Sequence, residues 1–153
     1  ANAHIPEAEE RARLVAALGW LRREVDVPLS ADTGRARVAA AALDAGAAIL
    51  NDVGGLRADP DMAAVAQHAA GLILMAREER PGGSGSVAMV RGLLRRSLAI
   101  AARHGIAAER IVLDPGIGFF RNCRIPWHAV DAGILRRLAR LGDLGRPLLV
   151  GVS

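Results

Sequence analysis

Two patterns of apolar residues alternate along this chain and predict its secondary structure. Between residues 6 and 24 the apolar positions Leu14, Leu18 and Leu21 fall three and four apart, the spacing of one buried face of an α-helix. Other apolar residues form short continuous runs, such as GLILMA and RIVLD. Because these runs lack polar alternation, we expect both faces of each strand to be covered, as in parallel sheets wrapped by helices.

Helical and strand patterns follow one another along the chain. The helices are predicted over residues 6–24, 35–45, 59–71, 87–104 and 130–141. The strands are predicted in VPLSA, AAIL, GLILMA, RIVLD and RPLLVGVS. Gly46 is placed to end a helix, and Asp59-Pro60 is a typical helix start. The segment REERPGGSGS, residues 77–86, interrupts the pattern and predicts a mobile loop or a linker.

This alternation predicts one α/β domain with a parallel sheet. Two architectures fit, a doubly wound open sheet and a (β/α)8 barrel. Polar residues stand at the ends of all five strands: Asp32, Asn51 with Asp52, Arg77 with Glu78, Asp114, and Ser153. The carboxyl ends of parallel strands meet at one edge, where both architectures bind ligands. One polar group per strand fits the rim of a barrel better than a crevice.

The DPGIGFF segment is the most distinctive of these strand ends. Pro115 stops the strand, and Gly116 and Gly118 tolerate backbone angles that other residues resist, so a ligand can approach closely. Phe119 and Phe120 could then cover the ligand. The alternative is an ordinary turn at the end of a strand. A dinucleotide-binding loop is disfavoured because the third glycine of that motif is absent.

Composition narrows the class of protein. A chain of 153 residues that is 52% hydrophobic suffices for one domain with a core. No apolar run approaches the roughly 18 residues of a membrane span, and the N-terminus lacks the layout of a signal peptide. We therefore expect a cytoplasmic protein without membrane contact.

A single cysteine, Cys123, agrees with a reducing compartment, and Arg121 and Arg124 nearby are expected to lower its pKa.

The net charge of +4 raises the question of a nucleic-acid partner. All 20 basic residues are arginines, and they scatter over separate predicted helices without interleaved aromatic residues. We therefore expect no nucleic-acid partner. The four histidines show no spacing typical of a metal site.

Five segments resemble, in order and at appropriate spacing, the dihydropteroate synthase family of pterin-binding barrel enzymes: SADT followed by a helix, AAILNDVGGL, LILMA, ERIVLDPGIGFF and LGRPLLVGVS. The resemblance extends over about residues 28–153. It implies an α/β TIM (β/α)8 barrel, present here as a partial barrel of about five parallel strands with helices. Residues 1–153 would form one pterin-binding domain, incomplete at both ends.

Enzymes of this family condense 6-hydroxymethyl-7,8-dihydropterin diphosphate with 4-aminobenzoate to 7,8-dihydropteroate in folate biosynthesis, releasing diphosphate. The resemblance implies that Asp114 binds the N–H donors of the pterin edge and that Asn51 supplies both a donor and an acceptor. It also implies that Asp32 is a further carboxylate beside the pterin. Asp32 would stabilise positive charge as diphosphate departs, which makes it the expected catalytic residue.

Three further residues are implied in substrate binding. Met75 would pack on the pterin ring, and Phe119 would wall the diphosphate and aminobenzoate side. Ser153 ends the matching LLVGVS segment.

Plainer interpretations of these positions stay open. Asp32 and Thr33 could cap the helix that follows them. Asn51-Asp52 could form a turn, and Met75 could be an ordinary core residue.

Departures from the family pattern limit what we expect of this chain. After Ser153 the family continues with an arginine and a lysine that help to bind pterin and aminobenzoate, and the strand with the asparagine for Mg²⁺ has no counterpart here. The family implies Mg²⁺ as a cofactor and a homodimer. We expect a longer barrel protein to be the active transferase and the 153 residues alone to be inactive, because five strands of eight cannot close a barrel.

Two alternative functions stay open. One is the pterin domain of a methyltransferase that passes a methyl group from methyltetrahydrofolate to a corrinoid protein, since such domains share the barrel and the pterin carboxylates. The other is a non-catalytic pterin-binding paralogue. The altered stretch from Ala76 to Ser86 motivates the paralogue, because many family members have a histidine where Ala76 stands.

Overall fold

The computed structural model describes residues 5–78 and 83–151. Its centre is a sheet of four parallel strands, β1 (Ser30–Asp32), β2 (Ile49–Asp52), β3 (Gly71–Met75) and β4 (Ile111–Asp114). The strands lie in the order β1-β2-β3-β4, which is their order in the chain. A doubly wound sheet reverses its order at a switch point, whereas a barrel adds each strand beside the last. The strand order therefore favours the barrel over the open sheet.

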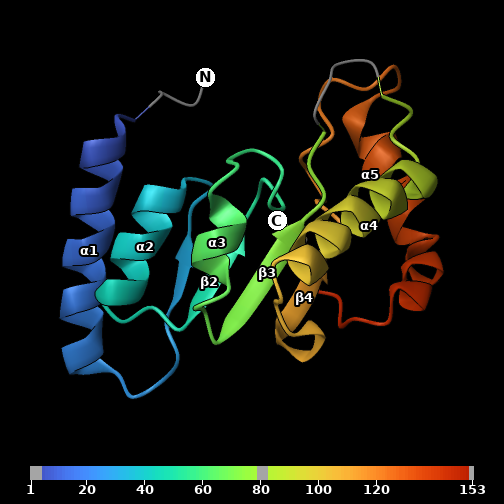
Figure 1. Cartoon of the computed structure of the whole chain (residues 1–153). Coiled ribbons are helices and arrows are strands. Elements are labelled where there is room, and N and C mark those ends of the chain that lie inside the picture. The colour runs from blue at the N-terminus through green and yellow to red at the C-terminus, as the bar shows by residue number, and fades with distance from the viewer. Residues whose placement is uncertain (1–4, 79–82, 152–153) are drawn as a thin grey trace.

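Helices connect the strands, as the sequence pattern predicts. They are α1 (Glu7–Glu24), α2 (Ala36–Asp44), α3 (Met62–Ala66), α4 (Val87–Arg103) and α5 (Trp127–Leu135), with the 3-10 helices η1 (Ala108–Arg110) and η2 (Leu138–Leu144). In Figure 1, α3 lies in front of the strands near β2, and α4 lies in front of β3 and β4. The helices thus form a layer over one face of the sheet.

The hydrophobic core lies between the sheet and this helix layer. Alternate strand residues, among them Leu50, Leu72 and Leu113, are almost fully buried in one cluster with Val90 and Leu94 of α4. Full burial of one such side chain contributes about 1.5–3 kcal/mol to folding. Burial of the apolar strand residues against the helices therefore stabilises the sheet.

The opposite face of the sheet is more open than predicted. In β2 and β4 the residues between the buried ones are only partly covered, and they include Ile49, Asn51, Val112 and Asp114. The expectation that both faces are covered is therefore wrong for these strands. The reason is geometric, because the inner faces of barrel strands are shielded only when the barrel closes, and four strands do not close one.

The predicted fifth strand is reduced to a single bridge. Leu148 forms an isolated parallel bridge with Leu113, in which the Leu113 N–H donates to the Pro147 carbonyl and the Leu149 N–H donates to the Leu113 carbonyl, both at 2.9 Å. The described sheet therefore has four strands rather than about five. Pro147 has no N–H and cannot extend the ladder toward its own N-terminal side.

Two helices differ from their predicted bounds. α3 begins at Met62 and ends at Ala66, and its N-cap position is Asp61 rather than Asp59. The Asp59 carboxylate accepts instead from the Asp61 N–H at 3.0 Å and from the Ala36 N–H at 2.8 Å. The helix predicted over 130–141 starts earlier, at Trp127, and is replaced after Leu135 by the separate η2. Pro126 at its N-cap position explains the earlier start, since proline is tolerated there.

The first helix packs on the second at the edge of the molecule (Figure 1). Of its predicted apolar stripe, Leu18 is buried and Leu14 is partly buried against the core. Polar contacts complete this packing, because Glu10 accepts from the Thr33 hydroxyl at 2.6 Å and from Arg35 at 2.7 Å. Among residues 5–78 and 83–151, no helix is both long and apolar enough to cross a membrane.

Candidate functional site

The strand register brings four predicted site residues onto the open face of the sheet. Asp32 is paired with Asn51 across β1 and β2, and Asn51 is paired with Ile73 of β3. Met75, two residues further along β3, is paired with Asp114 of β4. Because residues two apart in a strand share a face, Asp32, Asn51, Met75 and Asp114 lie on one side of the sheet. This is the side that the helices do not cover.

Asp32 and Asn51 are in direct contact. The Asn51 Nδ2 donates to Asp32 Oδ2 over a long 3.4 Å. Partial burial raises the pKa of Asp32 above its ordinary value, the hydrogen bond from Asn51 opposes this, and repulsion from Glu10 adds to it. A carboxylate held in this way keeps accepting capacity for another donor.

The side-chain oxygen of Asn51 is the clearest sign of a missing partner. Asn51 Oδ1 is buried and has no hydrogen-bond partner among the residues that the structure describes. A buried acceptor without a partner costs about 1–3 kcal/mol, so such atoms in folded proteins usually meet a donor. A ligand N–H placed on the open face would supply that donor.

Asp114 completes the polar part of this face. Its Oδ1 accepts from the Gly116 N–H at 2.7 Å, which fixes the carboxylate at the end of β4, and Oδ2 has no partner within the described ranges. Burial raises the pKa of Asp114, and the bond from Gly116 lowers it. From strand spacing and rise, the Cα atoms of Asn51 and Asp114 lie about 12 Å apart. Their side chains and one two-ring ligand can together span that distance.

Met75 is buried at 3% exposure, yet it is not part of the main hydrophobic cluster. It lies instead on the face that carries Asp114. The interpretation of Met75 as an ordinary core residue is thereby weakened, and an apolar contact for a flat ligand stays a prediction.

The loop after Asp114 approaches the end of β3 very closely. Gly116 has φ +74°, and a Cβ at this position would lie 2.0 Å from the Ala76 carbonyl oxygen. Only glycine fits such a contact. The two phenylalanines that follow differ in burial, since Phe120 is fully buried and Phe119 is 47% exposed. The expectation that both cover a ligand is wrong for Phe120, which belongs to the core.

Asp52 shows what a purely structural acid looks like at the same edge. It is 1% exposed, and its carboxylate accepts from the Gly54 N–H at 2.7 Å and the Leu56 N–H at 2.6 Å. Burial raises the pKa of Asp52, and these backbone bonds lower it. The turn interpretation thus holds for Asp52 but does not account for Asn51.

The capping interpretation of Asp32 is not supported. The N-cap position of α2 is Arg35, without a side-chain cap, and the Ala36 N–H is bonded to Asp59. Thr33 accepts from the Arg35 N–H at 3.3 Å, so the local turn uses Thr33 and leaves Asp32 to face the open side.

Asp131 is a buried acid that sequence reasoning missed. It lies in α5 at 7% exposure, and both of its oxygens are 3.1 Å from the Gly118 N–H. The signal available was an acid in the otherwise apolar run AVDAGIL. Ser153, also predicted for the site, lies outside the described residues. So does the centre of the predicted 77–86 loop, residues 79–82.

The predicted effect of arginine on Cys123 is wrong. Burial raises the pKa of the Cys123 thiol, and repulsion and a 3.5 Å hydrogen bond from its Sγ to Glu78 Oε1 raise it further. Arg121 is engaged elsewhere, because its Nε donates to the Gly118 carbonyl at 2.8 Å and its guanidinium lies 4.5 Å from the Trp127 ring centroid.

A resident Mg²⁺ does not fit the described residues. Within residues 5–78 and 83–151 there is no group of three or more His, Cys, Asp or Glu side chains that could hold a metal ion.

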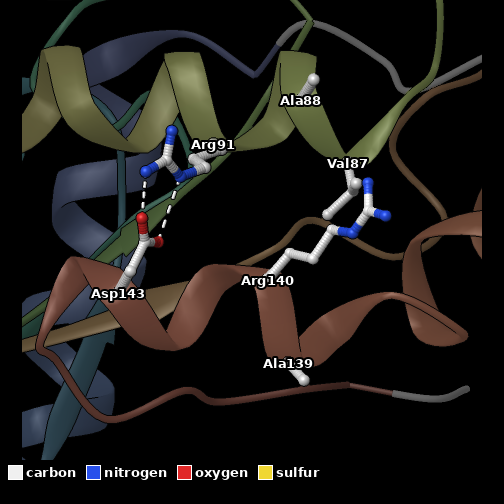
Figure 2. Close-up of a pocket in the computed structure, with 6 residues that line it drawn as sticks. All are labelled: Val87, Ala88, Arg91, Ala139, Arg140 and Asp143. Atoms are coloured by element: carbon white, nitrogen blue, oxygen red, sulfur yellow. Dashed lines mark hydrogen bonds and ion pairs between the residues drawn. The ribbon is translucent and has the colours of Figure 1, made fainter.

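A separate hollow of about 440 Å³ lies between α4 and η2 (Figure 2). Its lining residues are Val87, Ala88, Arg91, Ala139, Arg140 and Asp143. Arg91 forms a bidentate ion pair with Asp143 across it. None of the predicted site residues lines this hollow, so it is distinct from the strand-end face.

The family profile described as "Pterin binding enzyme" matches residues 1–153. The chain therefore belongs to the pterin-binding enzyme family, and its four parallel strands with their helices form part of that family's TIM barrel.

Curated proteins similar to this chain include dihydropteroate synthases. The protein from Synechocystis is 38% identical over 153 residues, covering 95% of this chain and 51% of the relative. The Bacillus subtilis protein is 33% identical over 150 residues, covering 97% and 51%. This chain thus spans about half the length of the curated relatives it matches.

Solved structures agree with this placement. Dihydropteroate synthase from Clostridium difficile, determined in the presence of pteroic acid, superimposes with a TM-score of 0.88 at 33% identity, over 99% of this chain and 57% of that one. The Xanthomonas albilineans enzyme in complex with 7,8-dihydropteroate gives 0.87 at 32% identity, over 99% and 55%.

Proposed function

We propose that this chain provides the pterin-binding part of a dihydropteroate synthase, with residues 1–153 as one partial barrel domain. The observation that carries the proposal is the buried, unpartnered Asn51 Oδ1, which lies beside Asp32 on the same sheet face as Asp114. A pterin carries amino and ring N–H donors along one edge, and such an edge suits an amide oxygen and a fixed carboxylate.

Each site residue receives a role from its contacts. Asp114, held by the Gly116 N–H, accepts from the pterin edge, and Asn51 offers Oδ1 to a second donor. Met75 packs against the ring, and Ser153 contributes to substrate binding. These groups hold the ring so that its hydroxymethyl carbon faces the incoming amine.

Asp32 is the proposed catalytic group. Departure of diphosphate spreads positive charge into the pterin, and a carboxylate already in place stabilises that charge more than the neutral ground state. The incoming 4-aminobenzoate then attacks the same carbon, with Phe119 at its side. The Xanthomonas albilineans enzyme, solved with 4-aminobenzoic acid, supports this choice of second substrate for the family fold.

The open inner face suggests that the chain alone binds pterin without turnover. A graft tests this directly: the chain replaces the matching half of the Synechocystis synthase, and diphosphate release is measured with both substrates. Release is expected from the graft and not from the chain alone. A folded graft that binds pterin without releasing diphosphate would indicate a non-catalytic paralogue, and a graft that binds no pterin would refute the proposal.

Asp114→Asn in the graft should weaken pterin binding by about 100-fold, because a neutral amide loses the charge-assisted bonds and presents its own N–H groups to a donor. Asp44→Asn is the matched control, since Asp44 is exposed at the end of α2. An unchanged dissociation constant for Asp114→Asn would remove Asp114 from the site. From the family resemblance we also propose that the protein is a cytoplasmic homodimer. Analytical ultracentrifugation tests the oligomeric state, and a sedimentation coefficient of a monomer would contradict the homodimer.

A further inference from the structure

Asp131 is a buried acid outside the set of residues proposed to touch substrate. It is 7% exposed, and its two oxygens share one donor, the Gly118 N–H, at 3.1 Å each. Burying a carboxylate is costly unless it is hydrogen-bonded, so this contact ties the loop after β4 firmly to α5.

The other side of Gly118 is held to the same helix. Arg121 Nε donates to the Gly118 carbonyl at 2.8 Å, and the Arg121 guanidinium lies 4.5 Å from the ring centroid of Trp127, the first residue of α5. Gly118 itself has φ +84°, a conformation that a single hydrogen bond helps to select from the many open to glycine.

Phe119 lies between two fixed points. Gly118 before it is bonded to Asp131, and Phe120 after it is fully buried in the core. Phe119 is 47% exposed, so its own packing does little to fix it. The Phe119 N–H also donates to the Gly116 carbonyl at 3.1 Å, so the bond between Asp131 and Gly118 is one of two backbone contacts that set the position of Phe119.

Asp114 is anchored independently of Asp131. It belongs to β4, its carboxylate is bonded to the Gly116 N–H, and Gly116 is wedged against the Ala76 carbonyl. Loss of the Asp131 contact should therefore move Phe119 while leaving Asp114 in place.

We propose that Asp131 is a positioning residue that holds the Gly118–Phe119 segment in the place where the aromatic amine binds, and so controls the affinity for the amine half of the ligand rather than for the pterin half. This role rests on the proposed function. It assigns to Asp131 no contact with substrate.

Two probes separate the halves of the ligand. 6-Hydroxymethylpterin reports the pterin half alone, and pteroic acid reports pterin and aminobenzoate together. In the full chain, Asp131→Ala should weaken binding of pteroic acid by about fivefold or more, as expected for the loss of one ordering contact, and leave binding of 6-hydroxymethylpterin within about twofold. Asp131→Asn keeps an acceptor for the Gly118 N–H and should restore pteroic acid affinity. Asp44→Ala controls for loss of an exposed acid.

A double-mutant cycle tests whether Asp131 acts through Phe119. In a Phe119→Ala background, Asp131→Ala should have little further effect on pteroic acid. Amide hydrogen exchange of Gly118 gives a readout without ligand: the amide should be protected in the unaltered chain and in Asp131→Asn, and exposed in Asp131→Ala.

The outcomes separate the two proposals. Equal pteroic acid affinity in the unaltered chain and Asp131→Ala, parallel loss of both probes, or additive effects in the cycle would each overturn the role of Asp131 while leaving pterin binding standing. Failure of the unaltered chain to bind either probe would overturn the proposed function and this role with it. A Gly118 amide that exchanges equally fast in all variants would overturn the hydrogen bond on which the role depends.

Discussion

Asn51 and Asp52 are neighbours at the end of β2, yet the sheet gives them opposite surroundings. Asp52 faces the helices and accepts two backbone N–H bonds, from Gly54 and Leu56, within 2.7 Å. Asn51 faces the open side, where its side chain makes one hydrogen bond to the described residues, 3.4 Å long, and its Oδ1 has no described partner. The pair shows that the two-residue period of a strand can separate a loop-building acid from a ligand-facing amide within one dipeptide.

The largest effect should come from the helix side of this pair. Asp52→Ala leaves two buried N–H groups without an acceptor and is expected to lower the free energy of unfolding by about 2–4 kcal/mol. Urea denaturation measures this, with Asp44→Ala as the exposed control. A loss no greater than that of the control would mean that Asp52 does not build the loop.

The open side should respond in binding and not in stability. Asn51→Ala removes an acceptor that no described group uses together with the long hydrogen bond to Asp32, and these two losses have opposite effects, so the free energy of unfolding should change little. The dissociation constant for 6-hydroxymethylpterin should rise about tenfold, because the ligand loses its acceptor. Isothermal titration and thermal melts on the same sample check both parts. Destabilisation comparable with Asp52→Ala would erase the contrast between the two faces.

The smallest effect concerns the charge of Asp32 on the same open face. Burial raises the pKa of Asp32 in the folded chain above its ordinary value of 3.8, so folding favours the protonated form. The stabilisation that protonated Asp32 provides is therefore fully present below pH 3.8, and it is lost as the pH rises through the raised pKa of the folded chain.

Asp32→Asn should therefore stabilise the fold slightly at neutral pH, by less than about 1 kcal/mol because the group is half exposed, and by nothing at acid pH. Thermal melts at the two pH values measure the difference. A lower melting temperature for Asp32→Asn at neutral pH would show that the carboxylate is a structural group, like Asp52.

The sequence was sufficient for the order of the helices and of the first four strands, and for the polar residues at the ends of those strands, because hydrophobic period and strand polarity are local properties. It was not sufficient for burial of the second sheet face. A continuous apolar run such as GLILM looks alike whether its second face meets helices or the inside of a barrel.

Contacts between distant segments were also beyond the sequence pattern. The bond between Gly118 and Asp131 spans 13 residues and depends on the start of α5 at Trp127, three residues before the predicted start. In the same way, two adjacent phenylalanines carry no local signal that Phe120 enters the core and Phe119 stays at the surface.

We propose that Asp32, Asn51 and Asp114 all bind one pterin on the open face of the sheet. A crystal structure of the chain with pteroic acid tests it most directly. We expect the N–H edge of the pterin to lie within hydrogen-bond distance of Asn51 Oδ1 and of the Asp114 carboxylate. Pteroic acid bound only in the hollow between α4 and η2, or on the helix side of the sheet, would contradict it.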